Sequence, residues 1–199
     1  VTELGPVGVV AIAGGLTCWL IAAVSTPIDD IGPWGLVSNL PPLWFIGFAV
    51  LLVFTATRAT TPNVDPRGPM IGLISLTFVV YGTTAIATNT LRYPWSYKHV
   101  GVIRLLDTTG RLHPHVDIYN NFSGFFGLGA LVRGGTGADP LDYGAWAQVV
   151  ASGLIMCAVW VLVRSATRRA DAAHLAALLY LLTDWVGQTG GAGGNGSDG

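Results

Sequence analysis

Long apolar stretches alternate with short polar ones along this 199-residue chain. A helix needs about 20 mostly apolar residues to cross the hydrocarbon core of a bilayer, and five stretches approach or reach that length. The fifth is short, with His174 at one end and Asp184 near the other. The pattern predicts an all-α fold, in which residues 1–188 form a polytopic transmembrane helix bundle. The expected spans cover residues 6–25, 40–57, 69–89, 146–163 and 172–187.

The loop at residues 90–145, between the third and fourth expected spans, has a pattern of its own. Structureless loops longer than about 15 residues are uncommon, and this one contains two amphipathic segments. Residues 95–111 place apolar side chains near helical spacing, with Gly110 as a helix stop. Residues 121–133 carry a second apolar stripe and are too short to cross a bilayer. We expect two juxtamembrane helices lying at the membrane interface.

Composition supports a membrane protein. Hydrophobic residues make up 51% of the chain and charged residues only 11%, against roughly 25% charged in an ordinary soluble domain. The net charge of −1 does not indicate a nucleic-acid partner. Cys18 and Cys157 both fall in apolar stretches without metal-binding spacing, so they are read as small apolar side chains of the bundle.

The basic residues predict an orientation. Cytoplasmic loops of membrane proteins are enriched in Lys and Arg. Here two short loops carry them, while the loop at residues 26–39 contains neither. We therefore expect a multi-pass plasma-membrane protein with a cytoplasmic N-terminus and an extracytoplasmic loop at residues 90–145. The glycine-rich tail, residues 189–199, is expected to be disordered. The arginines of the two basic loops are Arg58, Arg67, Arg164, Arg168 and Arg169.

The segments around the long loop carry a family resemblance. Residues 105–111 and residues 113–122, continuing to Gly124-Phe125-Phe126, resemble the outer loop of polytopic GT-C-type glycosyltransferases. Residues 92–101, followed by residues 117–119 and Gly124-Phe125-Phe126, are similar to an actinobacterial group of such proteins. Residues 185–188 fit that group too. The resemblance covers about half of the chain. It implies an N-terminal fragment, because members of the group normally continue into further spans.

The resemblance implies a function. It points to transfer of a sugar from a polyprenyl-phosphate donor to a cell-envelope glycan or lipid on the extracytoplasmic face. The expected partners are the lipid bilayer, the lipid-linked donor and the acceptor. A non-catalytic membrane subunit, a transporter or a flippase component is the alternative, and a truncated or inactive member of the glycosyltransferase group is the intermediate case. Inverted repeats and helices broken at mid-membrane, which a transporter would favour, are not evident in the sequence.

Such a transfer needs a base near the acceptor hydroxyl and positive groups near the leaving phosphate. GT-C-type enzymes usually place an acid directly after the preceding span, and residues 93–99 contain none. The catalytic candidates are therefore Asp117, in the polar stretch between the two loop helices, and His99, because histidine commonly acts as a general base. The substrate-binding candidates are Arg92, Lys98, Arg104, His113, His115 and Tyr119.

Simpler interpretations stand beside these. Asp117 could cap a helix, and the long basic side chains could anchor the loop at the lipid headgroups. His113 and His115, with Asp117 two residues on, offer ligands for a divalent cation, but the spacing matches no established metal motif. Solvated loop histidines are the simpler interpretation, so no metal site and no cofactor is predicted. A bound divalent cation stays an open alternative.

Overall fold

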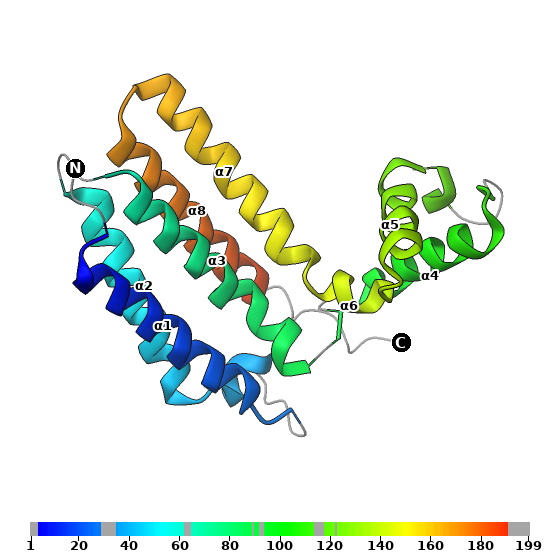
Figure 1. Cartoon of the computed structure of the whole chain (residues 1–199), viewed down its shortest axis with the longest axis horizontal. Helices are drawn as coiled ribbons and strands as arrows, with labels where there is room; N and C mark the ends of the chain where they lie inside the picture. The colour runs from blue at the N-terminus through cyan, green and yellow to red at the C-terminus, as the bar shows by residue number, and fades with distance from the viewer. Residues whose placement is uncertain are drawn as a thin grey trace. The chain divides into compact units, whose positions relative to one another are not determined.

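The computed structural model describes residues 4–28, 35–61, 65–88, 90–91, 94–113, 118–121 and 123–190. Over these residues the chain is helical and contains no strand, which confirms the predicted all-α fold class. The chain divides into two compact units (Figure 1). The membrane unit comprises residues 1–87 and 149–199, and the inserted unit comprises residues 88–148.

Five long helices build the membrane unit and run side by side (Figure 1). α1 and α2 each begin with a proline, which is tolerated there because the first N–H groups of a helix have no intrahelical partner. A short 3-10 turn, η1 (Gly35–Asn39), precedes α2. The helices are α1 (Pro6–Val24), α2 (Pro42–Thr60), α3 (Arg67–Thr88), α7 (Ala147–Thr167) and α8 (Ala170–Gly190).

Among the described residues, four helices are long and apolar enough to cross a membrane: α1, α2, α3 and α7. They indicate a membrane-embedded protein. The sequence predicted about five spans. The fifth expected span is present as the helix α8, but Asp171, His174 and Asp184 interrupt its apolar sequence and it is not among the four. Whether α8 crosses the membrane stays a prediction.

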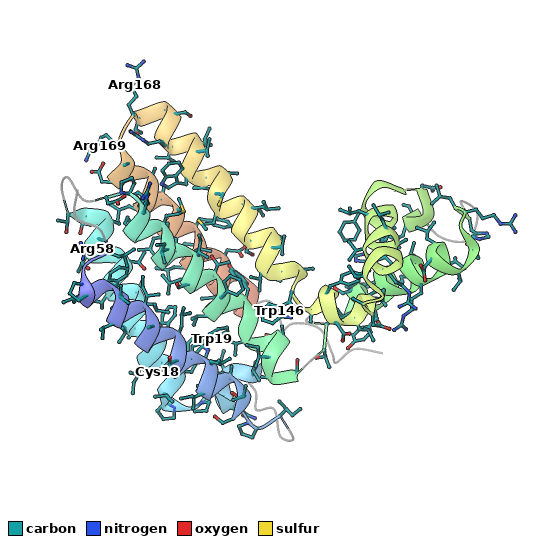
Figure 2. The ribbon with its side chains drawn as sticks, in the orientation of Figure 1. Cys18, Trp19, Arg58, Trp146, Arg168 and Arg169 are labelled. Atoms are coloured by element: carbon teal, nitrogen blue, oxygen red, sulfur yellow. The ribbon has the colours of Figure 1, made fainter. Side chains whose placement is uncertain are left out.

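The basic residues of the membrane unit lie at one end of it. Figure 2 shows Arg58, Arg168 and Arg169 together at the end where α2 and α7 finish and α8 begins. Arg168 ends α7 in a left-handed conformation with φ of 57°, and its carbonyl accepts a hydrogen bond from the Arg164 guanidinium. Arg169 pairs with Asp171, which holds the pKa of that carboxyl at about 2. We name this region the arginine end.

Two glycines let α1 and α2 approach closely. A Cβ atom at Gly47 would lie 2.6 Å from the carbonyl oxygen of Gly15 and 3.0 Å from the backbone nitrogen of Trp19. A Cβ at Gly15 would lie 2.6 Å from Leu51 Cγ. Small residues at such positions are the usual way for membrane helices to gain packing contacts, because lipid supplies little hydrophobic driving force between them.

We expect Gly47→Ala to destabilise the membrane unit by about 1–3 kcal/mol, the usual range for overpacking. The added methyl would meet backbone atoms of α1, which cannot move aside without separating the helices. Reversible unfolding in mixed detergent micelles measures the change. Gly14→Ala is the matched control, since a Cβ there has nothing within 4 Å. Equal stability of the two variants would contradict the close contact.

α3 is the most buried of the four candidate spans, because 61% of its 18-residue apolar stretch is buried in the protein. On one side a Cβ at Gly72 would lie 2.2 Å from Thr55 Oγ1, so α3 packs tightly on α2. On that side as well, Thr83 Oγ1 accepts hydrogen bonds from Trp19 Nε1 of α1 and Trp44 Nε1 of α2, both at 2.9 Å. This three-helix contact, which we name the Thr83 pin, fastens α1 and α2 to α3.

A second polar contact joins α3 to α8. The hydroxyl of Tyr81 donates a hydrogen bond to Asp184 Oδ2 at 2.5 Å. Ser152 of α7 is buried and is hydrogen-bonded to the side chains of Tyr81 and Tyr180. A polar side chain within a membrane bundle is strongly favoured to find such partners, because lipid offers none. α3 therefore carries hydrogen bonds toward four neighbouring helices.

The inserted unit is a small helical assembly. It consists of α4 (Pro94–Thr109), the 3-10 turn η2 (Ile118–Asn121), α5 (Ser123–Thr136) and α6 (Pro140–Ala145). Val102 and Ile103 of α4 pack against Phe126 of α5 to form its core. α5 approaches α4 closely at Gly129, where a Cβ would lie 2.7 Å from Ile103 Cδ1.

Glycine ends both long helices of this unit. Gly110 has φ of 63° and Gly137 has φ of 74°, a left-handed conformation that glycine adopts without strain. Their N–H groups donate to Leu106 O at 2.8 Å and Arg133 O at 2.7 Å, which closes each helix. The sequence predicted the stop at Gly110, and the structure confirms it. α4 lies close to the expected range of 95–111, and α5 begins two residues and ends three residues later than the expected range of 121–133.

Some elements differ from expectation. α6 and η1 were not predicted, because each is shorter than two turns and leaves little periodicity in the sequence. Thr189 and Gly190, expected in the disordered tail, form the last residues of α8. The rest of that tail, residues 191–199, lies outside the described residues.

Candidate functional site

His99 of α4 lies in an aromatic cluster within the inserted unit. Its ring centroid is 4.9 Å from that of Tyr119 in η2 and 5.6 Å from that of Phe126 in α5. The Tyr119 contact is edge-on, with the two planes at 76°. The ammonium group of Lys98 lies 5.4 Å from the centroid of the Tyr119 ring, within cation–π range. We name these residues, Lys98, His99, Tyr119 and Phe126, the His99 cluster.

The geometry of this cluster follows from local structure. α4 and α5 share the core at Val102, Ile103 and Phe126, one helical turn beyond His99 on α4. η2 packs on both helices, which brings Tyr119 beside His99 although 20 positions separate them. His99 is half-buried, so its ring is oriented by its neighbours and still open to solvent. The cluster thus brings together three groups: an imidazole, which can accept or donate a proton, a lysine ammonium and a phenol hydroxyl.

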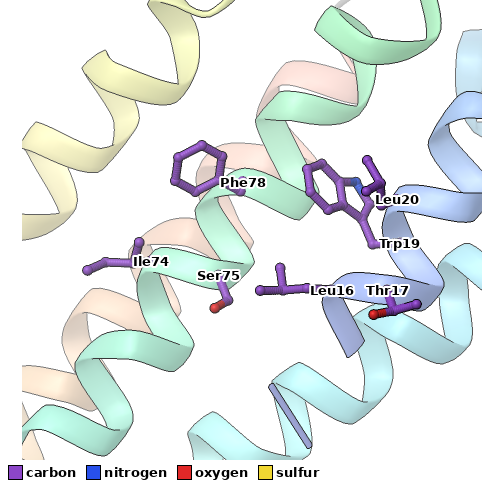
Figure 3. A pocket seen from close by; sticks show the side chains of 7 residues that line it. All are labelled: Leu16, Thr17, Trp19, Leu20, Ile74, Ser75 and Phe78. Atoms are coloured by element: carbon purple, nitrogen blue, oxygen red, sulfur yellow. The ribbon is translucent and has the colours of Figure 1, made fainter. Parts of the chain in front are cut away.

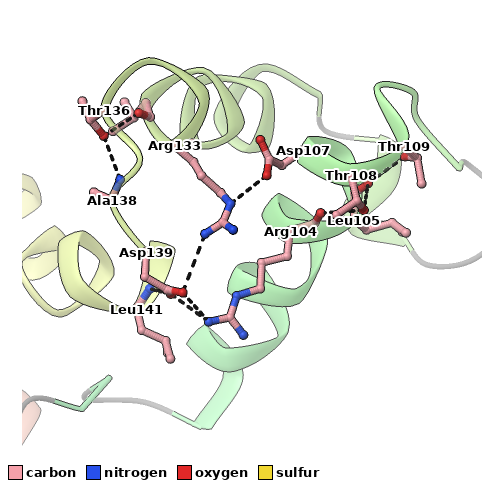
Figure 4. Close-up of polar contacts among 12 residues, drawn as sticks. Arg104, Leu105, Asp107, Thr108, Thr109, Arg133, Thr136, Ala138, Asp139 and Leu141 are labelled. Atoms are coloured by element: carbon pink, nitrogen blue, oxygen red, sulfur yellow. Dashed lines mark hydrogen bonds and ion pairs between the residues drawn. The ribbon is translucent and has the colours of Figure 1, made fainter.

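Arg104 lies in a different setting (Figure 4). Its Nη2 atom donates to both carboxylate oxygens of Asp139 at 2.8 Å. Arg133 Nε donates to Asp107 Oδ2 at 2.7 Å, and Arg133 Nη1 lies 3.7 Å from Asp139 Oδ2. These four side chains form a network that ties α4 and α5 to the start of α6. The arginine predicted to bind a donor phosphate is thus engaged with Asp139.

Asp139 also caps α6. Its Oδ1 accepts a hydrogen bond from the N–H of Leu141 at 2.9 Å, and Pro140 occupies the first helical position. That N–H and the Arg104 guanidinium lower the pKa of Asp139 below its ordinary value of 3.8. Asp107 raises the pKa of Arg133 further. The two arginines and two carboxylates of the network balance in formal charge.

The remaining predicted residues are not all placed. His113 Nε2 lies 3.2 Å from Thr109 Oγ1, in the turn that follows α4. Arg92, His115 and Asp117 lie outside the described residues. The structure thus brings together Lys98, His99 and Tyr119, whereas Arg104 is paired with Asp139. Among the described residues, no group of three or more His, Cys, Asp or Glu side chains is arranged to hold a metal ion.

α5 presents an apolar face outside this core. Phe125, Leu128 and Leu131 lie on one side of the helix, with exposed fractions of 62%, 61% and 71%. Trp95 at the start of α4 is 69% exposed. The inserted unit lies in the sequence between α3 and α7, two helices that could cross a membrane. Its exposed apolar side chains are therefore close in sequence to candidate membrane spans. This pattern is typical of helices that lie at a membrane interface.

Comparison with known proteins returns no matching protein-family model, no matching curated protein and no matching solved structure. The candidate site therefore rests on the geometry and chemistry of the chain itself.

Sequence reasoning did not find the network around Asp139. One signal for part of it was present: Asp139 directly before Pro140 is the pattern of a helix N-terminus, with an acceptor at the cap and proline in the first turn. The pairing with Arg104, 35 positions earlier, had no signal in the sequence. The Thr83 pin was missed for the same reason.

Proposed function

We propose that this chain is a membrane glycosyltransferase of the GT-C type, or the N-terminal part of one, and that the His99 cluster acts on a lipid-linked sugar donor. The contact of His99 with Tyr119, next to Lys98, carries this proposal. A histidine can accept the proton of an acceptor hydroxyl. A lysine ammonium and a tyrosine hydroxyl offer donors to a phosphate.

The arginine end supports the proposed location of the chemistry. Loops rich in arginine stay on the cytoplasmic side. α3 begins at the arginine end and α7 finishes there. The inserted unit is therefore connected to the other ends of these two helices. Under this orientation the inserted unit is extracytoplasmic. The exposed apolar face of α5 would then hold it at the outer leaflet, where a polyprenyl-phosphate sugar presents its headgroup.

A transfer assay tests the proposal. Membranes containing the full-length protein are given radiolabelled polyprenyl-phosphate sugars, and incorporation into glycan or lipid is measured. We expect transfer by the wild type and its loss in Asp117→Asn, since Asp117 is the acidic catalytic candidate that the sequence offers. Asp142→Asn is the matched control, because it makes the same change at an exposed carboxylate of α6. Equal loss in both variants would contradict a specific role for Asp117.

A non-catalytic membrane subunit is a second candidate, and one observation favours it. Arg104, an expected phosphate ligand, is already paired with Asp139, so this part of the inserted unit has the character of a structural module. Wild-type membranes that transfer nothing from any supplied donor, at normal protein levels, would favour this candidate over the enzyme.

A further inference from the structure

A groove of about 420 Å³ runs between α1 and α3 in the membrane unit. Figure 3 shows the side chains that line it. Its floor is formed by Trp19 and Ser75, which are 7% and 5% exposed. Its rim is formed by Leu20, Ile74 and Phe78, which are 49%, 44% and 40% exposed. Leu16 and Thr17 complete the lining.

The walls of the groove are held from behind. Trp19 is fixed by its hydrogen bond to Thr83 Oγ1. α1 packs on α2 through Gly15 and Gly47, while α3 packs on α2 through Gly72. Because α2 holds both helices, the groove between them is part of the packed bundle. Binding of an occupant therefore requires little additional ordering of the protein, and this small entropic cost favours binding.

The position of the groove determines what it can hold. Leu16 and Phe78 lie in the middle turns of α1 and α3, both of which are candidate membrane spans. At that depth the surroundings are lipid hydrocarbon, not headgroups or water. The lining is mostly apolar: its polar groups are the hydroxyls of Thr17 and Ser75 and the indole N–H of Trp19, which donates to Thr83. The volume also falls within the range of ligand pockets, about 300–1,000 Å³.

We propose that this groove binds one acyl chain of a membrane phospholipid as an ordered part of the bundle. A single flexible hydrocarbon chain matches the depth of the groove in the candidate spans and its mostly apolar lining. Phospholipid acyl chains are the apolar molecules present at that depth throughout the bilayer. The chain fills the space between α1 and α3 and adds dispersion contacts with Trp19 and Phe78. This lipid site is independent of the proposed transfer reaction.

Site-specific photocrosslinking tests the site. A benzophenone side chain replaces Phe78 in the groove or Val50 on α2, which is 38% exposed and matches the 40% of Phe78. Both positions lie in the middle of a candidate span, but only Phe78 lines the groove. The full chain is irradiated in phosphatidylglycerol and phosphatidylethanolamine vesicles, and again after purification in mild detergent. Adducts are identified by mass.

We expect phospholipid adducts at both positions in vesicles, and severalfold more at position 78 after detergent has diluted the bulk lipid. Equal loss at positions 78 and 50 would overturn the proposal, since it would show only bulk lipid contact. An adduct with an isoprenoid mass would overturn the acyl assignment, and a crosslink into α1 would show that the groove is closed.

A filling variant gives a second measurement. Ser75→Leu places a larger side chain on the floor of the groove, and the position-78 adduct in detergent should fall to the level at position 50. Val53→Leu is the control, since it adds bulk on α2 at a side chain that is 62% exposed and outside the groove. An adduct that survives in Ser75→Leu would contradict binding in the groove. If Ser75→Leu does not fold, the comparison of positions 78 and 50 still decides.

Discussion

Replacing Thr83 with valine is expected to destabilise the membrane unit by about 2–4 kcal/mol, because two buried indole groups lose their acceptor at once. Trp19 Nε1 and Trp44 Nε1 both donate to Thr83 Oγ1 at 2.9 Å. The hydroxyl in turn donates to Val79 O at 2.5 Å. A hydroxyl has one donor and two acceptor positions, so Thr83 is fully used and nothing in valine can replace it.

Unfolding in mixed detergent micelles, followed by tryptophan fluorescence, measures this effect. Thr83→Ser restores the hydroxyl and should restore most of the stability. Thr77→Val is the matched control: Thr77 is 3% exposed on the same helix, and its hydroxyl donates only to Leu73 O of that helix. If Thr77→Val and Thr83→Val are equally destabilising, the contact with the two tryptophans does not hold the three helices together.

The membrane helices were largely predictable because bilayer thickness sets a strong and simple requirement. An uninterrupted apolar stretch of about 20 residues has few other stable forms. α8 was the difficult element, since His174 and Asp184 weaken its apolar pattern. His174 is 2% exposed, and Asp184 accepts the hydrogen bond from Tyr81. The hydrogen bond from Tyr81, which a sequence pattern does not contain, accommodates Asp184 in α8.

The candidate site was predictable only in part. His99, Lys98 and Tyr119 could each be chosen by residue type and by their place in the loop. Their contact depends on η2 folding back on α4, which requires the core of Ile103 and Phe126. Arg104 shows the limit of residue type as a guide. An arginine suits a phosphate and a carboxylate equally well, and only the tertiary structure shows that Asp139 is within reach.

His99→Ala is expected to reduce transfer of the lipid-linked sugar by about 100-fold or more, the range for loss of a general base. This prediction rests on the proposed function and is measured in the same transfer assay at equal protein levels. The alanine removes the proton acceptor and also the ring contacts with Tyr119 and Phe126. A second variant must therefore separate chemistry from packing.

His99→Phe makes that separation, because a phenyl ring keeps the aromatic contacts of α4 with η2 and α5 but accepts no proton. If His99 supplies the base, both variants lose transfer while His99→Phe keeps the stability of the wild type. Normal transfer by His99→Phe would assign His99 a packing role and would contradict its role as the base.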